Sequence, residues 1–166
     1  MAGLIKDNVN TKLDLVIEKL FCGNRIFDRA MSILNVTFVM NNTVKYIHPK
    51  LAHKFPALSD FVSDYQASRN CTSIYGLTPR DESEYTSPLE IFNKFYDYQL
   101  ELEDVIKEAY ITAIDEDDCF TNSFLQSFML DIIPVTEQIK LLVDKASNYN
   151  DNWMAFDHDI KKFIII

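Results

Sequence analysis

The stretch SPLEIFNKFYDYQLELEDVIKEAYITA, residues 87–113, gives the clearest indication of how this chain folds. Along it, mostly apolar residues recur every three or four positions, which is the spacing of the buried face of an α-helix. Ser87 and Pro88 begin the stretch, and they are favoured residues for a helix cap and a first helical turn. The stretch therefore predicts a helix over about residues 88–114. The residues expected on its buried face are Leu89, Phe92, Phe95, Gln99, Leu102, Ile106, Ala109 and Ala113.

Three further segments show the same helical spacing of apolar residues. They cover about residues 10–40, 43–69 and 121–146. The connections after the first and third helices are short, whereas residues 70–86 form a long polar connection. Short, long and short connections are typical of two antiparallel helical hairpins joined by a crossover. We therefore expect a single all-α domain, residues 1–166, built as a four-helix bundle.

Three prolines interrupt this helical pattern. Pro49 could occupy the first turn of the second helix with His48 as its cap, so that this helix starts late or bends. Pro56 and Pro134 lie farther inside their helices, where a proline removes a backbone hydrogen bond. The pattern leaves open whether these two prolines break their helices or only bend them.

The last segment, residues 153–163, is amphipathic and predicts a short fifth helix. After Phe163 the chain ends in three isoleucines, residues 164–166. One interpretation folds this segment back onto the bundle. The other makes its apolar end an assembly contact, because exposed apolar residues favour association.

Composition limits the classes of function. The formal net charge is −9 and the sequence pI is about 4.7, and Lys and Arg are scattered, so we expect no nucleic-acid binding. No apolar stretch reaches the roughly 18 residues of a membrane span, so we expect no membrane partner. The three cysteines, Cys22, Cys71 and Cys119, form no disulfide or CxxC pattern. With no signal-like apolar run in the first ten residues, they predict reduced thiols in a cytoplasmic protein.

Motifs in the second half of the chain resemble the third and fourth helices of bacterial ferritins. One is TSPLEIF, residues 86–92, preceded by Tyr85. Another is NSFLQSF, residues 122–128, at the matching separation. VDK at residues 143–145 and DHD at residues 157–159 are similar to the end of the family's fourth helix and to its final short helix.

This resemblance covers about residues 79–160, and in the first half it rests on helix length and order. It implies a ferritin-like four-helix bundle with a long crossover between helices two and three and a short C-terminal fifth helix. It also implies a homo-oligomeric cage that oxidises and stores iron. That chemistry needs carboxylates and a histidine that point into the bundle centre from several helices.

The positions implied for these iron ligands carry other residues here. They fall near Asn24 and Arg25 in the first helix, Lys54 and Ala57 in the second (with His53 close by), Gln99 in the third, and Ile132 and Val135 in the fourth. A buried iron pair without carboxylates would keep about four or more unneutralised charges in a medium of low dielectric constant. We therefore expect a degenerate ferroxidase site without fast ferroxidase activity, and either iron or no cofactor.

Five residues remain as candidate metal ligands: His48, His53, Asp60, Asp64 and Asp131. Asp60 and Asp64 lie one helical turn apart, and Asp131 precedes one of the implied ligand positions. The two histidines are five residues apart, which differs from the four-residue spacing that aligns two histidines on an α-helix. If these residues act together, they resemble the site between two subunits of a mini-ferritin. Otherwise His48 caps a helix and His53 lies on the surface.

Three hypotheses of function follow. The first is a ferritin homologue that stores iron oxidised elsewhere or keeps only the shell. The second is a non-catalytic structural or interaction bundle that binds a protein partner through an aromatic-rich face or the Ile-rich tail. The third is a mini-ferritin-like metal protein with a site between subunits. The mass of the particle in solution and its metal content distinguish the three.

Overall fold

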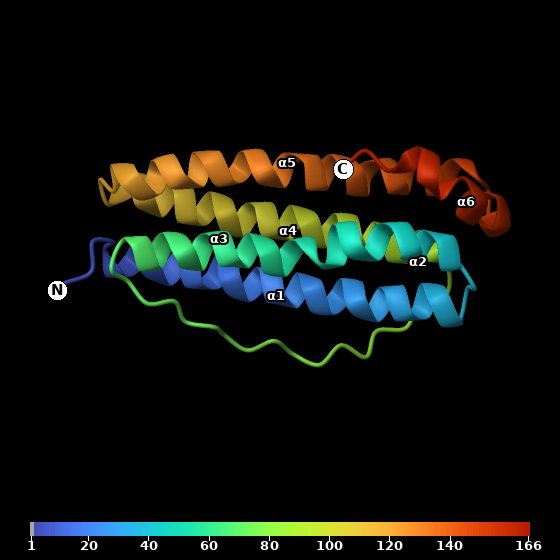
Figure 1. The fold of residues 1–166 in the computed structure, drawn as a ribbon, viewed down its shortest axis with the longest axis horizontal. Coiled ribbons are helices and arrows are strands. Elements are labelled where there is room, and N and C mark those ends of the chain that lie inside the picture. The colour runs from blue at the N-terminus through green and yellow to red at the C-terminus, as the bar shows by residue number, and fades with distance from the viewer. Residues whose placement is uncertain (1) are drawn as a thin grey trace.

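The computed structural model describes residues 2–166, and in that part of the chain it contains helices, turns and loops but no strand. The bundle consists of four long helices, of which the second is built from three consecutive segments (Figure 1). A short C-terminal helix follows, so the predicted architecture is confirmed. The elements are α1 (Asp7–Val36), α2 (Asn41–Ile47), the π-helical η1 (His48–Ala52), α3 (Lys54–Ser68), α4 (Pro88–Asp115), α5 (Cys119–Asn148), α6 (Trp153–Asp159) and the 3-10 segment η2 (Ile160–Phe163).

The long helices lie side by side, with α1 packed against α3 and α4, and α4 packed against α5. The connection between α3 and α4 runs as an extended chain along α1 from one end of the bundle to the other (Figure 1). Side chains of α1 hold it there: the Asp14 carboxylate accepts the N–H of Ile74 at 2.9 Å, and Arg29 Nε donates to the carbonyl of Ser83 at 3.2 Å. The predicted crossover is therefore fastened to the bundle at several points.

Both helices of the second hairpin, α4 and α5, begin with side-chain caps. Ser87 Oγ accepts the N–H of Glu90 at 3.2 Å, and the N–H of Thr86 donates to Glu90 Oε2 at 2.7 Å. The hydrogen bonds from the N–H and the hydroxyl of Thr86 lower the pKa of Glu90. Asp118 Oδ1 accepts the N–H of Thr121 at 3.0 Å in the same way. Each cap satisfies backbone N–H groups that a helix start leaves without an intrahelical partner.

The sequence left open whether the second helix starts late, with His48 as its cap, or bends, and the structure shows no late start. The helix begins at Asn41 in α2 and continues through η1 into α3. The N–H of His53 donates to the carbonyl of His48 at 3.4 Å, five residues back, so the chain widens into a π turn around Pro49. His48 therefore lies within the helix, and its side chain hydrogen-bonds the carboxylate of Asp28 on α1.

Pro56 lies in the third position of α3 and does not break the helix. Because a proline has no N–H, the carbonyl of Ala52 four residues earlier loses its usual donor. Asn24 of α1 supplies the replacement, since its Nδ2 donates to that carbonyl at 3.0 Å. Pro134 is likewise accommodated, because α5 continues from Cys119 to Asn148 without interruption. Both of the prolines that the sequence left open are therefore inside continuous helices.

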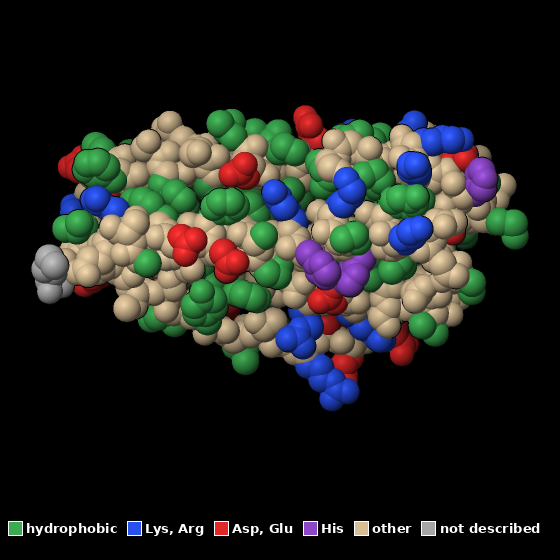
Figure 2. Space-filling view, in the orientation of Figure 1, with side chains coloured by type: hydrophobic (Ala, Val, Ile, Leu, Met, Phe, Trp, Pro, Cys, Tyr) green, Lys and Arg blue, Asp and Glu red, His purple; other side chains and the backbone are tan. Residues whose placement is uncertain are grey.

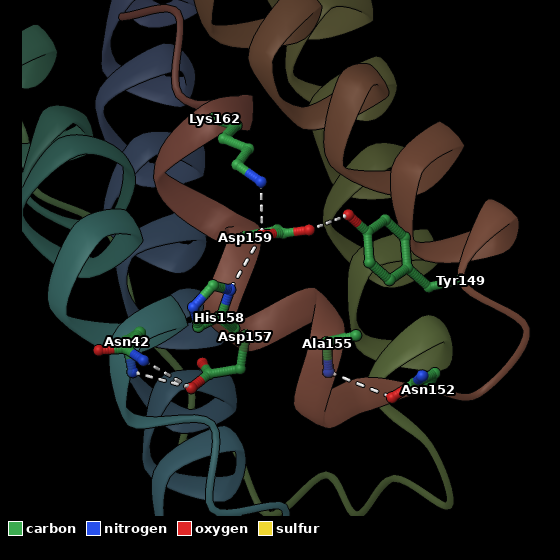
Figure 3. Close-up of polar contacts among 8 residues, drawn as sticks. All are labelled: Asn42, Tyr149, Asn152, Ala155, Asp157, His158, Asp159 and Lys162. Carbon is green, nitrogen blue, oxygen red and sulfur yellow. Dashed lines mark hydrogen bonds and ion pairs between the residues drawn. The ribbon is translucent and has the colours of Figure 1, made fainter.

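The C-terminal segment folds back onto its own bundle, as one of the two interpretations expected. Asp157 receives the N–H of Thr43 at 2.7 Å and so caps the start of α2 (Figure 3 shows this carboxylate beside Asn42). Asp159 accepts hydrogen bonds from the Tyr149 hydroxyl at 2.9 Å and from Lys162 at 2.7 Å (Figure 3). Phe156, Ile160 and Phe163 are buried, while Met154 and Ile165 stay exposed.

No helix within residues 2–166 is both long enough and apolar enough to cross a membrane.

Candidate functional site

The resemblance implies metal ligands at the bundle centre, and aromatic side chains fill that centre here. Phe27 of α1 stacks on Phe95 of α4, with ring centroids 3.8 Å apart and planes 9° apart. The rings of Phe55 of α3 and Phe27 pack edge to face, with their centroids 4.8 Å apart. All three side chains are fully buried. Aromatic rings from three of the four long helices are therefore in contact at this level.

Tyr98 continues the aromatic cluster along α4 toward α1. Its ring lies 6.4 Å from that of Phe55, and its hydroxyl donates to the carbonyl of Lys19. This close approach depends on Gly23, because a Cβ there would lie 2.6 Å from the Tyr98 ring. Burial raises the pKa of Tyr98 far above its usual range, so the hydroxyl stays protonated.

Gln99 is the polar residue next to this cluster, and it is fully buried. Its Nε2 donates to Thr136 Oγ1 at 3.0 Å, and that hydroxyl donates in turn to Glu103 Oε1 at 2.5 Å. In the described residues Gln99 Oε1 has no hydrogen-bond partner. Gln99 is therefore buried and uncharged, as expected. Through the Thr136 hydroxyl it is connected by hydrogen bonds to Glu103, whose carboxylate is half-buried.

Of the remaining implied ligand positions, Arg25 is exposed, and the others separate into two groups. Ile132 and Val135 of α5 are buried, and Asn24 is engaged with the Ala52 carbonyl. Lys54 and Ala57, in contrast, do not face the centre: Lys54 is half-buried and Ala57 is exposed.

Phe55 and Leu58, each one residue after an implied ligand position, are buried in this part of the second helix. Lys54 and Ala57, the positions that the resemblance implies, are therefore not part of the buried face of this helix.

No carboxylate is buried among the residues that the structure describes. The buried polar side chains are hydroxyls and amides, namely Thr43, Ser59, Gln66, Gln99, Thr121 and Gln138. An iron pair held between helices requires several carboxylates to balance its charge. The side chains at the centre of this bundle do not supply them.

Of the five candidate surface ligands, only the two histidines come together. The His48 and His53 ring centroids are 4.6 Å apart, and Figure 2 shows two histidine side chains in contact on this face. The π turn brings them together, because residues five apart lie on one side of it. The argument from α-helical spacing against their alignment is therefore wrong. Asp28 of α1, which sequence analysis missed, lies 2.9 Å from His48 Nε2.

The three aspartates do not join this pair. Asp60 and Asp64 are exposed on α3, and the structure gives neither side chain a contact with the histidines. Asp131 lines a separate groove together with Lys50 and Lys54. Over residues 2–166, no group of three or more His, Cys, Asp or Glu side chains is arranged to hold a metal ion.

The bundle, with its long crossover and short fifth helix, defines this chain as a protein of the ferritin-like fold. It superimposes on an open-pore ferritin from the archaeon Archaeoglobus fulgidus with a TM-score of 0.85 at 16% identity, covering 96% of each chain. A humanized archaeal ferritin superimposes with a TM-score of 0.82 at 17% identity, again over 96% of each chain. For Chlorobium tepidum ferritin the TM-score is 0.81 at 19% identity, over 96% of this chain and 99% of the ferritin chain. No protein-family model matches the sequence, and no curated protein sequence does either.

Proposed function

We propose that this protein is a ferritin-like bundle related to iron storage that lacks a working di-iron ferroxidase centre. The observation that carries the proposal is the packing of Phe27, Phe55 and Phe95 where such a centre would lie. The protein then acts as a homo-oligomeric shell that holds iron oxidised elsewhere, or it retains the scaffold alone. Its free cysteines suit a cytoplasmic protein.

Charge balance supports the absence of a centre. Two iron ions bring about four or more positive charges, which are prohibitively costly to bury without anionic ligands. Gln99 offers a neutral amide oxygen, and Asn24 already uses its amide on the Ala52 carbonyl. Any iron in the protein would therefore collect at surface carboxylates, which are plentiful in a chain with a net charge of −9.

Oxygen consumption tests the proposal directly. About two ferrous ions per chain, the stoichiometry of a di-iron centre, are added to the purified protein in air, and dissolved oxygen is followed with an electrode. We expect oxygen uptake no faster than in protein-free buffer. Rapid uptake that saturates at that ratio would refute the proposal.

Particle mass and iron content then separate the storage shell from the bare scaffold. A large hollow particle that retains iron after chelation supports storage, and native mass spectrometry with elemental analysis measures both. A monomer or dimer without iron would instead favour the structural or interaction bundle. Neither result affects the oxygen test, so the two parts of the proposal can fail separately.

A further inference from the structure

We propose that His48 and His53 form a surface binding site for one divalent cation of the borderline class, such as Zn²⁺, and that Asp28 orients His48 in it. The proposal concerns the outer face of the second helix, not the bundle centre, so it does not depend on whether the protein handles iron. It rests on three features of the structure: the π turn, the hydrogen bond to Asp28, and the open groove around the two rings.

The π turn places the two imidazoles on the same side of the helix. The hydrogen bond from the His53 N–H to the His48 carbonyl, 3.4 Å long, spans five residues. The ring centroids are consequently 4.6 Å apart, with an angle of 59° between the planes. In a regular α-helix the corresponding pair would be four residues apart. π turns are rare and occur often at functional sites, and this one begins at one histidine and ends next to the other.

Asp28 fixes the state in which His48 can bind a cation. Its Oδ1 lies 2.9 Å from His48 Nε2, and a carboxylate can only accept a hydrogen bond. In neutral His48 the proton is therefore on Nε2, and Nδ1 keeps the lone pair that a metal needs. In the described residues no other hydrogen bond engages Nδ1 of His48 or either ring nitrogen of His53. A carboxylate behind a ligating histidine is the usual arrangement at protein zinc sites.

The surroundings leave room for the rest of the coordination sphere. His48 is half-buried and His53 is exposed, and both border an open groove of about 460 Å³. Ser32 and Asn35 of α1 line the same groove with a hydroxyl and an amide. Two imidazoles would come from the protein and the remaining positions from water. This ligand set suits Zn²⁺, Cu²⁺ or Ni²⁺, whereas Mg²⁺ and Ca²⁺ prefer all-oxygen sites.

The chain itself supplies a matched control, because it contains three histidines. The third, His158, is 84% exposed and is also hydrogen-bonded to a carboxylate, that of Asp159. His48→Gln is the informative change at the site, since the Gln amide keeps an N–H donor toward Asp28 while Nδ1 is lost. His53→Gln removes the second ligand at an exposed position. All variants are made with Cys119→Ser, because the exposed thiol of Cys119 would compete for the metal.

Zn²⁺ affinity is measured by competition with a chromophoric chelator, and circular dichroism confirms that each variant is folded. We expect H48Q and H53Q each to weaken Zn²⁺ binding by more than about tenfold, and D28N by about tenfold as the loss of an orienting carboxylate. H158Q should leave the affinity unchanged. The EPR spectrum of bound Cu²⁺ should show coupling to two imidazole nitrogens. Equal affinities in H48Q, H53Q and the parent, or an equal loss in H158Q, would overturn the proposal.

Discussion

The two helical hairpins of the bundle contain internal prolines, and they accommodate them differently. In α5, Pro134 leaves the carbonyl of Leu130 without its N–H donor, and the Leu130 side chain is 68% exposed, so water reaches this part of the helix. In α3, Pro56 leaves the carbonyl of Ala52 in the same state, but Ala52 is fully buried. There a side chain from the neighbouring helix, Asn24, has to make the hydrogen bond.

This difference shows what a buried proline requires of its surroundings. A carbonyl at the surface can use solvent, whereas a buried one needs a protein donor or remains unsatisfied at a cost of about 1–3 kcal/mol. The first hairpin meets this requirement with the side-chain amide of Asn24. Asn24 therefore has a structural role that accounts for it without any metal.

The largest expected effect comes from breaking the aromatic contact that joins the hairpins. Phe95→Ala removes a fully buried ring stacked on Phe27, and we expect a loss of about 3–5 kcal/mol in the free energy of unfolding. Urea denaturation followed by circular dichroism measures it. Phe61→Ala is the matched control, because Phe61 is 54% exposed, and it should cost less than about 1 kcal/mol. Similar losses in both variants would show that the cluster is not the junction.

The second prediction tests the link between Asn24 and Pro56. Asn24→Ala leaves the buried Ala52 carbonyl without a donor, so we expect about 1–3 kcal/mol of destabilisation. In a Pro56→Ala background the helix regains its own N–H donor, and Asn24→Ala should then cost clearly less. This double-mutant cycle isolates the pair. Asn93→Ala, at an exposed position of α4, is the control. Additive effects in the cycle would mean that Asn24 does not compensate for the proline.

The contrast between the two hairpins also explains how much of the fold the sequence pattern predicts. In the second hairpin, the predicted 88–114 helix corresponds to Pro88–Asp115, because Ser87 and Pro88 give a local start signal that no tertiary contact alters. In the first hairpin, the pattern predicted a helix over about residues 43–69 but left open whether Pro49 delays or bends it, since periodicity does not show that a π turn absorbs an extra residue.

The candidate metal site was only partly predictable for the same reason. His48 and His53 were identified by residue type, but their contact depends on the π turn. Asp28 lies on another helix, twenty positions before His48, and nothing in its own neighbourhood of sequence marks it. Asp60, Asp64 and Asp131 were selected by residue type and local spacing, which cannot tell which face of the bundle a side chain will share with another.

A third prediction compares the turns of the two hairpins. Val39 and Asp117 both have positive φ, 56° and 53° respectively. This conformation costs a β-branched residue about 1–2 kcal/mol, whereas Asp tolerates it better. We therefore expect Val39→Gly to stabilise the protein by about 0.5–1 kcal/mol, after the entropy cost of glycine. Asp117→Gly should change the midpoint of thermal unfolding little. A destabilised Val39→Gly variant would show that the exposed Val39 side chain contributes packing that the strain argument omits.

The smallest effect is expected where the C-terminal segment ties the hairpins together. Hydrogen bonds from Lys162, His158 and Tyr149 hold the pKa of Asp159 well below its usual range. A lowered pKa in the folded state means that the contribution of Asp159 to stability is present above the unfolded pKa of about 3.9 and is lost as the pH falls below it.

The fluorescence of the single tryptophan, Trp153, reports on the docking of this segment, because Trp153 begins α6 and its ring centroid lies 5.9 Å from that of Phe156. We expect an emission change on acidification between about pH 4 and pH 2. Asp159→Asn should show an altered signal already at neutral pH, whereas exposed Asp97→Asn should follow the parent. An unchanged pH profile in Asp159→Asn would mean that the apolar contacts of Phe156, Ile160 and Phe163 dock the segment alone, since these side chains are buried whatever the charge on Asp159.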